Sequence, residues 1–75
     1  MIGKNNMDKK DKLNYLLWKV HDSYDDFVVG VLNTAQNHNG YDKIIAFIEN
    51  DPSALSSDII RYMTEEILGI EPTDS

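Results

Sequence analysis

The sequence predicts an all-α fold, a small bundle of three to four helices, from two observations. Apolar residues recur at steps of three and four between residues 13 and 35, which is the period of a helix and not the alternation of a strand. Three breaking points, at Asn39-Gly40, at Asp51-Pro52 and at Gly69 before Pro72, then divide the chain into segments of helical length.

The first predicted helix covers about residues 9–37, because one apolar stripe keeps its phase throughout. The stripe passes through His21, Asp22 and Ser23, where neither glycine nor proline occurs. Ser23 and Asp26 also match a capping box, which would start a new helix. The pattern favours one long helix kinked near residue 23, with two separate helices as the alternative. The stripe consists of Leu13, Leu17, Val20, Tyr24, Val28, Val31 and Ala35.

Two shorter helices are predicted at about 41–50 and 54–68. Gly40 is expected to take the left-handed conformation that ends the first helix. Pro52 ends the next one, because it forces the preceding residue out of the helical region, and Ser53 is the expected N-cap of the last. The predicted buried faces consist of Tyr41, Ile44, Ile45 and Ile48, and then Ile59, Ile60, Met63, Ile67 and Ile70.

Length and composition restrict the function further. Seventy-five residues make a single helical domain, 1–75, with flexible ends expected at about 1–8 and 70–75. The absence of Cys excludes disulfides and thiolate metal sites, and no apolar run is long enough to cross a membrane. The lysine-rich start lacks the apolar stretch of a signal peptide, so we expect a cytoplasmic protein. Six lysines against one arginine hint at a bacterial or phage origin.

Charge is distributed unevenly along the chain. Residues 1–40 carry five lysines and five aspartates, whereas residues 41–75 carry two basic and eight acidic residues, so the net charge of −6 lies in the second half. A surface that binds nucleic acid should collect Lys and Arg, and this one does the opposite. The acidic half could instead imitate a phosphate backbone, which makes an inhibitor of a nucleic-acid-binding protein one alternative function.

Residues 44–63 resemble the first two helices of winged-helix DNA-binding domains. An aliphatic helix, a short turn with Pro52 and Ser53, and a second amphipathic helix follow one another in both. The resemblance covers about twenty residues, and neither a recognition helix nor a wing follows. It implies a transcription-related or nucleic-acid-linked regulator as a second alternative function.

Catalytic and metal-binding patterns are weak. His21 and Asp25 have the spacing to bridge a divalent metal, but a metal site needs at least three converging ligands. The segment 37–40 resembles part of a calcium loop, yet the acidic ligands at both ends of such a loop are missing. No phosphate-binding glycine motif is present. We therefore expect a protein that is not an enzyme, with no catalytic residue, cofactor or metal.

The most specific positive signal is a pair of aromatic residues in the first helix. Tyr15 and Trp18 project opposite the Leu13, Leu17 and Val20 stripe, and exposed aromatics rimmed by charge are typical of protein-binding hot spots. We therefore expect the protein to act by protein–protein interaction with a partner of unknown identity, and nucleic acid and membrane are not expected partners. The predicted contact residues are Tyr15, Trp18, Asp22 and Asp25; a homodimer is the alternative, on a face formed by Leu13, Leu16, Leu17 and Val20.

Overall fold

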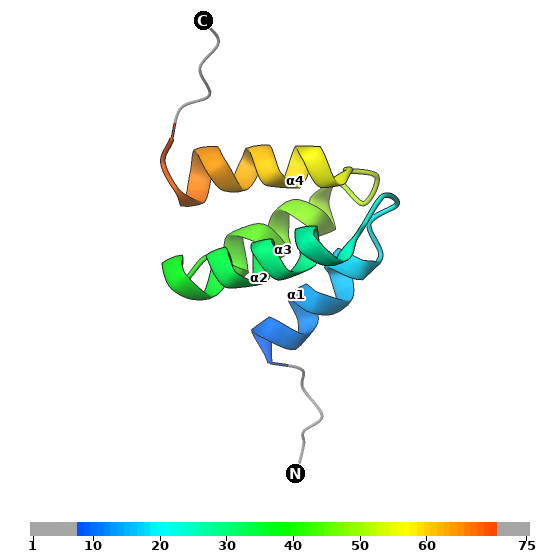
Figure 1. The fold of residues 1–75 in the computed structure, drawn as a ribbon, viewed down its shortest axis with the longest axis horizontal. Helices are drawn as coiled ribbons and strands as arrows, with labels where there is room; N and C mark the ends of the chain where they lie inside the picture. Colours follow the sequence, from blue (N-terminus) through cyan, green and yellow to red (C-terminus); the bar gives the residue numbers. More distant parts are fainter. Residues whose placement is uncertain (1–7, 71–75) are drawn as a thin grey trace, which may run out of the picture.

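The computed structural model describes residues 8–70, which form α-helices and no strand (Figure 1). The prediction of an all-α fold is confirmed. The predicted flexible ends lie almost entirely outside the described residues. Between residues 8 and 70, none of the helices has both the length and the apolar character of a membrane span. The helices are α1 (Lys9–Trp18), α2 (Asp25–His38), α3 (Tyr41–Asn50) and α4 (Ser56–Tyr62), and α4 continues directly as a π-helix, Met63–Ile67.

The prediction of one long helix over residues 9–37 is wrong, because α1 ends at Trp18 and α2 begins at Asp25. After Trp18 the next two N–H groups bond to carbonyls three residues back, at 3.1 and 3.2 Å, which tightens and closes the last turn. The two separate helices left open by the sequence are therefore observed. The stripe keeps its phase across the break because both helices bury it in the same core.

Ser23 does not cap α2. The cap position is Tyr24, whose backbone is extended and whose carbonyl accepts a hydrogen bond from the N–H of Val28 at 3.0 Å. The hydroxyl of Ser23 is buried without a hydrogen-bond partner. The capping box with Asp26 is thus not formed, and the connection between α1 and α2 is held by other contacts.

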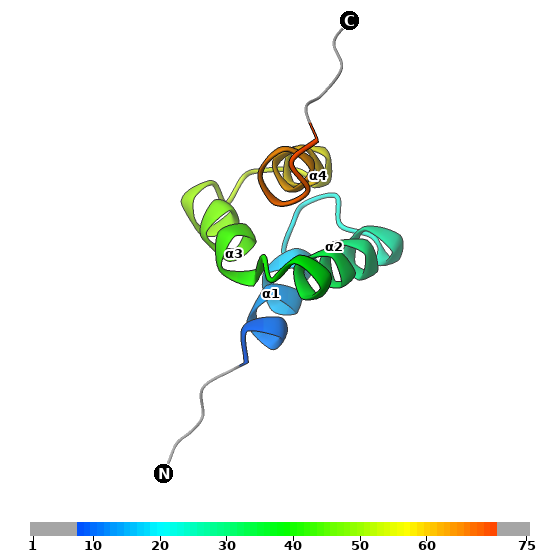
Figure 2. The same ribbon diagram turned by 90° about the vertical axis from the view of Figure 1, so that its left-hand side faces the viewer.

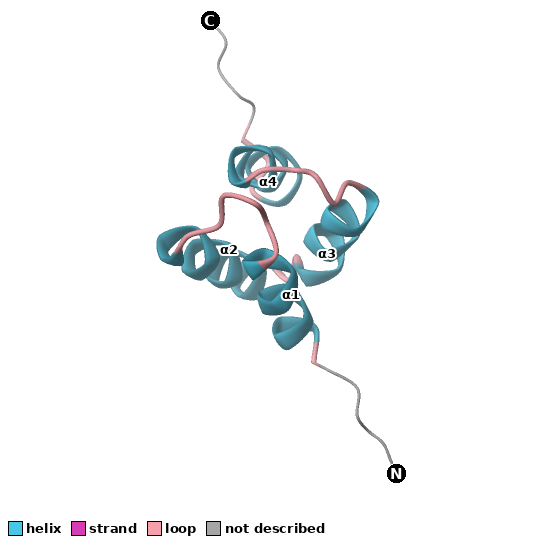
Figure 3. Ribbon diagram, turned by 90° about the vertical axis from the view of Figure 1, so that its right-hand side faces the viewer, coloured by secondary structure: helices cyan, strands magenta, loops and turns pink. Residues whose placement is uncertain are grey.

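The helices enclose one apolar core (Figures 2 and 3). α2 and α3 lie side by side, with α1 on one side of the pair and α4 on the other (Figure 1). The end views show the four helices arranged around a common interior. Every stripe residue of the first two helices is buried except Tyr24. The core consists of Leu13, Leu17, Val20, Phe27, Val28, Val31, Ala35, Ile44, Ile45, Ile48, Ala54, Ile59 and Met63.

The turn between α2 and α3 uses Asn39 and Gly40 differently from the prediction. Asn39 takes the left-handed conformation, with φ 53° and ψ 45°, whereas Gly40 has φ −104°. Gly40 is buried, and a Cβ atom there would lie 2.8 Å from Cδ1 of Ile67. A larger residue at this position would therefore require the end of the Ile67 side chain to shift, and the glycine matters here for close packing and not for its backbone angles.

The last helix begins two residues later than predicted, at Ser56. Ser53 is not its N-cap, because its hydroxyl donates to a carboxylate oxygen of Asp51 at 2.9 Å within the preceding turn. Asp58, in the first turn of α4, accepts a hydrogen bond from the N–H of Leu55 at 3.1 Å. The two burial predictions that fail here are those for Ile60 and Ile70, which are both exposed.

Candidate functional site

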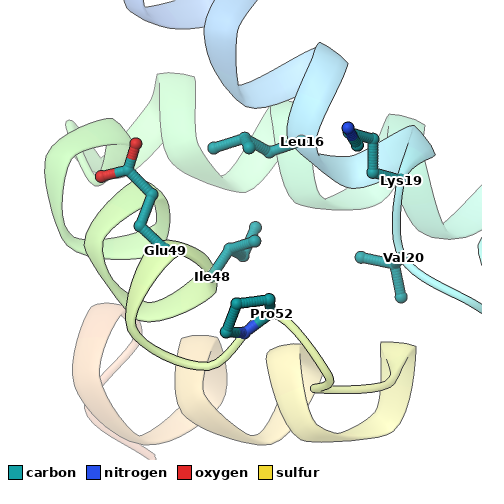
Figure 4. A pocket seen from close by; sticks show the side chains of 6 residues that line it. All are labelled: Leu16, Lys19, Val20, Ile48, Glu49 and Pro52. Atoms are coloured by element: carbon teal, nitrogen blue, oxygen red, sulfur yellow. The ribbon is translucent and has the colours of Figure 1, made fainter.

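The α1–α3 groove is a hollow of about 200 Å³ between the C-terminal ends of these two helices. Its apolar walls come from Leu16 and Val20 on one side and from Ile48 and Pro52 on the other, and these side chains converge on a shared space (Figure 4). Pro52, the second residue after the end of α3, lies at the lower side of the groove in Figure 4. The lining is completed by Lys19 and Glu49.

Two ion pairs connect α1 and α3, and one of them involves Glu49 of the groove. Lys12 on α1 pairs with Glu49 on α3 at 3.0 Å, and one helical turn earlier Lys9 pairs with Asp42 at 2.9 Å. All four side chains are substantially exposed, so each pair contributes little to stability. The pairs align α1 with α3 and leave the apolar floor of the groove open.

Tyr15 and Trp18 lie on the outer surface of α1, as the helical projection predicts. Their exposed fractions are 52% and 48%. Lys19, which lines the α1–α3 groove, places its Nζ 3.3 Å from the hydroxyl oxygen of Tyr15 and 5.0 Å from the centre of its ring. The aromatic surface of α1 therefore reaches the edge of the groove through this lysine.

The predicted dimer face is largely inside the single chain. Leu13 and Leu17 are 0% exposed, and Val20 is also buried. A homodimer on this face would require the first half of the stripe to be uncovered, but α3 packs against α1 and covers it. Leu16 alone among the four residues is partly exposed, and it lines the α1–α3 groove.

Asp22 has a role within the chain that the sequence does not show. Its two carboxylate oxygens accept hydrogen bonds from Ser56, one from the backbone N–H at 2.7 Å and one from the hydroxyl at 2.9 Å. The bond from the Ser56 backbone, assisted by the hydroxyl, holds the pKa of Asp22 below its usual value. Asp25 is exposed in the first turn of α2, where the helix dipole favours an acid. Of the four predicted contact residues, Asp22 is thus the one that bonds to a distant part of the chain, whereas Tyr15 bonds to Lys19 one turn away.

The segment that resembles a winged-helix domain forms α3, a turn and α4. A hollow of about 310 Å³ lies between these helices, beside the stacked rings of Phe47 and Tyr62, whose centres are 4.4 Å apart. Burial and the nearby Glu66 raise the pKa of Tyr62. The remaining lining residues carry three carboxylates and one guanidinium, a charge that repels phosphate; they are Asp51, Asp58, Glu65 and Arg61.

The helical projection places Tyr15 and Trp18 on the outside of α1, but the sequence does not indicate the groove between α1 and α3. Ile48, Glu49 and Pro52 lie some thirty residues from α1 in the sequence, and nothing in the local pattern indicates that they pack beside Leu16. The salt-bridge partners of Lys9 and Lys12 were equally hidden. Among residues 8–70, no cluster of three or more acidic or histidine side chains is placed to hold a metal ion.

Comparisons of the chain with protein-family models, with curated proteins and with solved structures found no match. Its function must therefore be inferred from the geometry of the chain itself.

Proposed function

We propose that the protein is a non-catalytic module that binds another protein through the outer surface of α1 and the α1–α3 groove. The observation that carries this proposal is the exposure of about half of both Tyr15 and Trp18 on α1, the helix whose Leu16 and Lys19 line an apolar hollow of about 200 Å³. Partly exposed aromatics beside a small apolar pocket are typical of the centre of a protein interface.

Two features of the surface support binding in preference to chemistry. The α1–α3 groove is walled by aliphatic side chains, and its two charged members are a lysine and a carboxylate that already pairs with Lys12. Lys19 rests on Tyr15 and keeps that ring in place, so less side-chain freedom is lost on binding. Asp22 remains in the proposed contact set, because it is exposed and each of its oxygens can accept a hydrogen bond besides the one from Ser56. The proposed compartment is the cytoplasm, in keeping with a chain that contains no Cys.

The test is affinity capture from a bacterial lysate with tagged wild-type protein and two variants, Trp18→Ala and Val29→Ala. Val29 is a matched control, since it is an exposed apolar residue on α2, away from the groove. We expect one partner to be retained by the wild type and by Val29→Ala. Trp18→Ala should weaken its binding by about 2 kcal/mol, or roughly thirtyfold in Kd.

Melting temperatures separate a contact residue from a structural one. Trp18→Ala should change the free energy of unfolding by less than about 1 kcal/mol, as surface substitutions usually do. A large loss of stability with partner binding intact would instead assign Trp18 to the fold and overturn the proposed contact surface.

A further inference from the structure

A second apolar groove lies on a different surface, between α2 and α4. It has a volume of about 250 Å³. One end is flanked by Tyr24, which is half exposed, and the α4 side by Ile60, which is 37% exposed. Figure 2 shows these two helices bordering each other along one side of the molecule. We call this feature the α2–α4 groove; its other lining residues are Asp26, Phe27, Gly30, Val31, Thr34 and Met63.

The packing of the chain does not require a glycine at position 30. It lies in the middle of α2, where glycine costs about 1 kcal/mol relative to alanine. A Cβ atom at this position would meet nothing within 4 Å, and the residue does not have a positive φ. Gly40, by contrast, lies in close contact with the side chain of Ile67. Because Gly30 and Thr34 are one turn apart on the groove, they form a shallow floor that another backbone can approach closely.

The two helices that border the α2–α4 groove hold five of the eleven carboxylates of residues 8–70 and most of the net charge of −5 that these residues carry. α2 has two carboxylates and neither lysine nor arginine, and α4 with its π-helical extension has three carboxylates and one arginine, a net charge of −4 for the pair. Asp25 and Asp26, at the Tyr24 end of the groove, form no ion pair within residues 8–70. The helices α1 and α3 together carry a net charge of +1. Of these carboxylates, Asp26 lines the α2–α4 groove, whereas Asp58 and Glu65 line the hollow between α3 and α4. The α1–α3 groove instead contains one charge of each sign, on Lys19 and Glu49.

We propose that the α2–α4 groove binds a basic amphipathic helix of a partner protein. The apolar face of that helix lies on Gly30 and Thr34 between Tyr24 and Ile60, and its Lys or Arg side chains face Asp25 and Asp26. Helix-in-groove recognition of this kind reads apolar residues at helical spacing, and charge complementarity sets the orientation. This proposal does not depend on the α1–α3 groove, and together the two surfaces would make the protein a connector of two partners.

The first experiment measures binding of a synthetic peptide to the full chain by fluorescence anisotropy. The probe is an amphipathic helix of about 18 residues, with leucine at positions i, i+3, i+4 and i+7 and lysine elsewhere. A second peptide has glutamate in place of lysine. We expect the basic peptide to bind at least about tenfold more tightly than the acidic one, and to shift the amide resonances of Gly30 and Thr34.

Non-specific attraction between a basic peptide and an acidic protein is separated from groove binding by Gly30→Gln. This variant changes no charge, and the open space above Gly30 together with the better helix propensity of glutamine keeps α2 folded. We expect its affinity for the basic peptide to fall about tenfold while its melting temperature rises. The double variant Asp25→Asn, Asp26→Asn should weaken binding mainly at low salt. Trp18→Ala, on the other surface, should leave the affinity unchanged.

Three results would overturn this proposal. One is equal affinity of the protein for the basic and acidic peptides. Another is an unchanged affinity of Gly30→Gln for the basic peptide. Either result would show that the peptide does not bind in the groove. The third is a dimer in sedimentation equilibrium that Gly30→Gln abolishes, which would assign the groove to a second copy of the chain. Trp18→Ala changes only the contact surface proposed on α1. An effect of this variant on partner capture, with peptide affinity unchanged, therefore bears on that surface and leaves the α2–α4 groove untouched, so either proposal can fail without the other.

Discussion

Asp22 and Ser56, 34 residues apart in the sequence, are joined by two hydrogen bonds to one carboxylate. Through them the connection between α1 and α2 caps the first turn of α4, a function that a neighbouring Ser, Thr, Asp or Asn usually performs. The residue before α4 is Leu55, which cannot supply such a bond. The first turn of α4 is therefore stabilised by a residue outside its own neighbourhood in the sequence, in the connection between α1 and α2.

Replacement of Asp22 by alanine should lower the melting temperature, because it leaves the N–H and the hydroxyl of Ser56 without an acceptor. Ser56→Ala should have a smaller effect, since the backbone bond remains. The double variant should be no less stable than Asp22→Ala alone, because both substitutions remove the same interaction. Thermal unfolding followed by circular dichroism measures all three; additive losses would mean that the two side chains act independently.

The carboxylate of Asp22 should also make the free energy of unfolding depend on pH. Its pKa is lower in the folded chain than the ordinary value of 3.8, so the bond to Ser56 contributes fully above that pH. The contribution is lost as the pH falls through the lowered pKa, when the carboxylate takes up a proton. Urea denaturation between about pH 2 and pH 6 should show wild type more stable than Asp22→Asn above about pH 5, with the difference shrinking below 3.8. A difference that stays constant across this range would contradict the assignment.

Gly30→Ala should stabilise the protein by about 1 kcal/mol, since it removes a mid-helix glycine at a position where the new methyl group meets no neighbour. For a domain of this size that corresponds to a rise of roughly 4–8 °C in melting temperature. Gly69→Ala is the matched control: it also has open space, but its φ of 72° should make alanine destabilising by about 1–2 kcal/mol. Equal effects at the two positions would show that backbone conformation is not the cause.

Gly40→Ala should destabilise the protein by about 1–3 kcal/mol, the usual cost of overpacking a tight contact. The new Cβ atom would lie 2.8 Å from Cδ1 of Ile67, the atom that Ile67→Val removes. In the double variant the loss should therefore be smaller than the sum of the two single losses. Chemical denaturation of the four proteins gives this coupling energy, and a value near zero would place the cost of Gly40→Ala elsewhere.

The helical spacing of apolar residues predicted most of this fold. The point at which the first helix is interrupted was harder to predict. The stripe from Leu13 to Ala35 and the helix Tyr41–Asn50 follow directly from apolar spacing. The end of α1 at Trp18 does not, because no glycine or proline marks it and the stripe stays in phase. The interruption is instead accompanied by a long-range contact, the bond between Asp22 and Ser56, that local sequence does not reveal.

The sequence was enough to predict which side chains of α1 are exposed, but not which of its faces another helix covers. A helical projection is enough to place Tyr15 and Trp18 on the outside of α1. The same projection placed Leu13 and Leu17 on one face but could not say that α3 covers them. Both grooves arise from pairs of helices, so their lining residues become neighbours only after the chain has folded.

The turn between α2 and α3 also affects how the protein ages chemically. An asparagine followed by glycine, such as Asn39-Gly40, is prone to deamidation, because the unhindered glycine nitrogen attacks the asparagine side chain to form a succinimide. Here the N–H of Gly40 donates to the carbonyl of Ala35 at 2.9 Å, which holds that nitrogen in place and occupies its proton. We expect deamidation to be slow in the folded chain and fast in urea, as mass spectrometry of incubated samples would show. The isoaspartate product would lengthen the backbone at this turn and push Gly40 out of its contact with Ile67, so that a chain damaged while unfolded would return to a less stable fold.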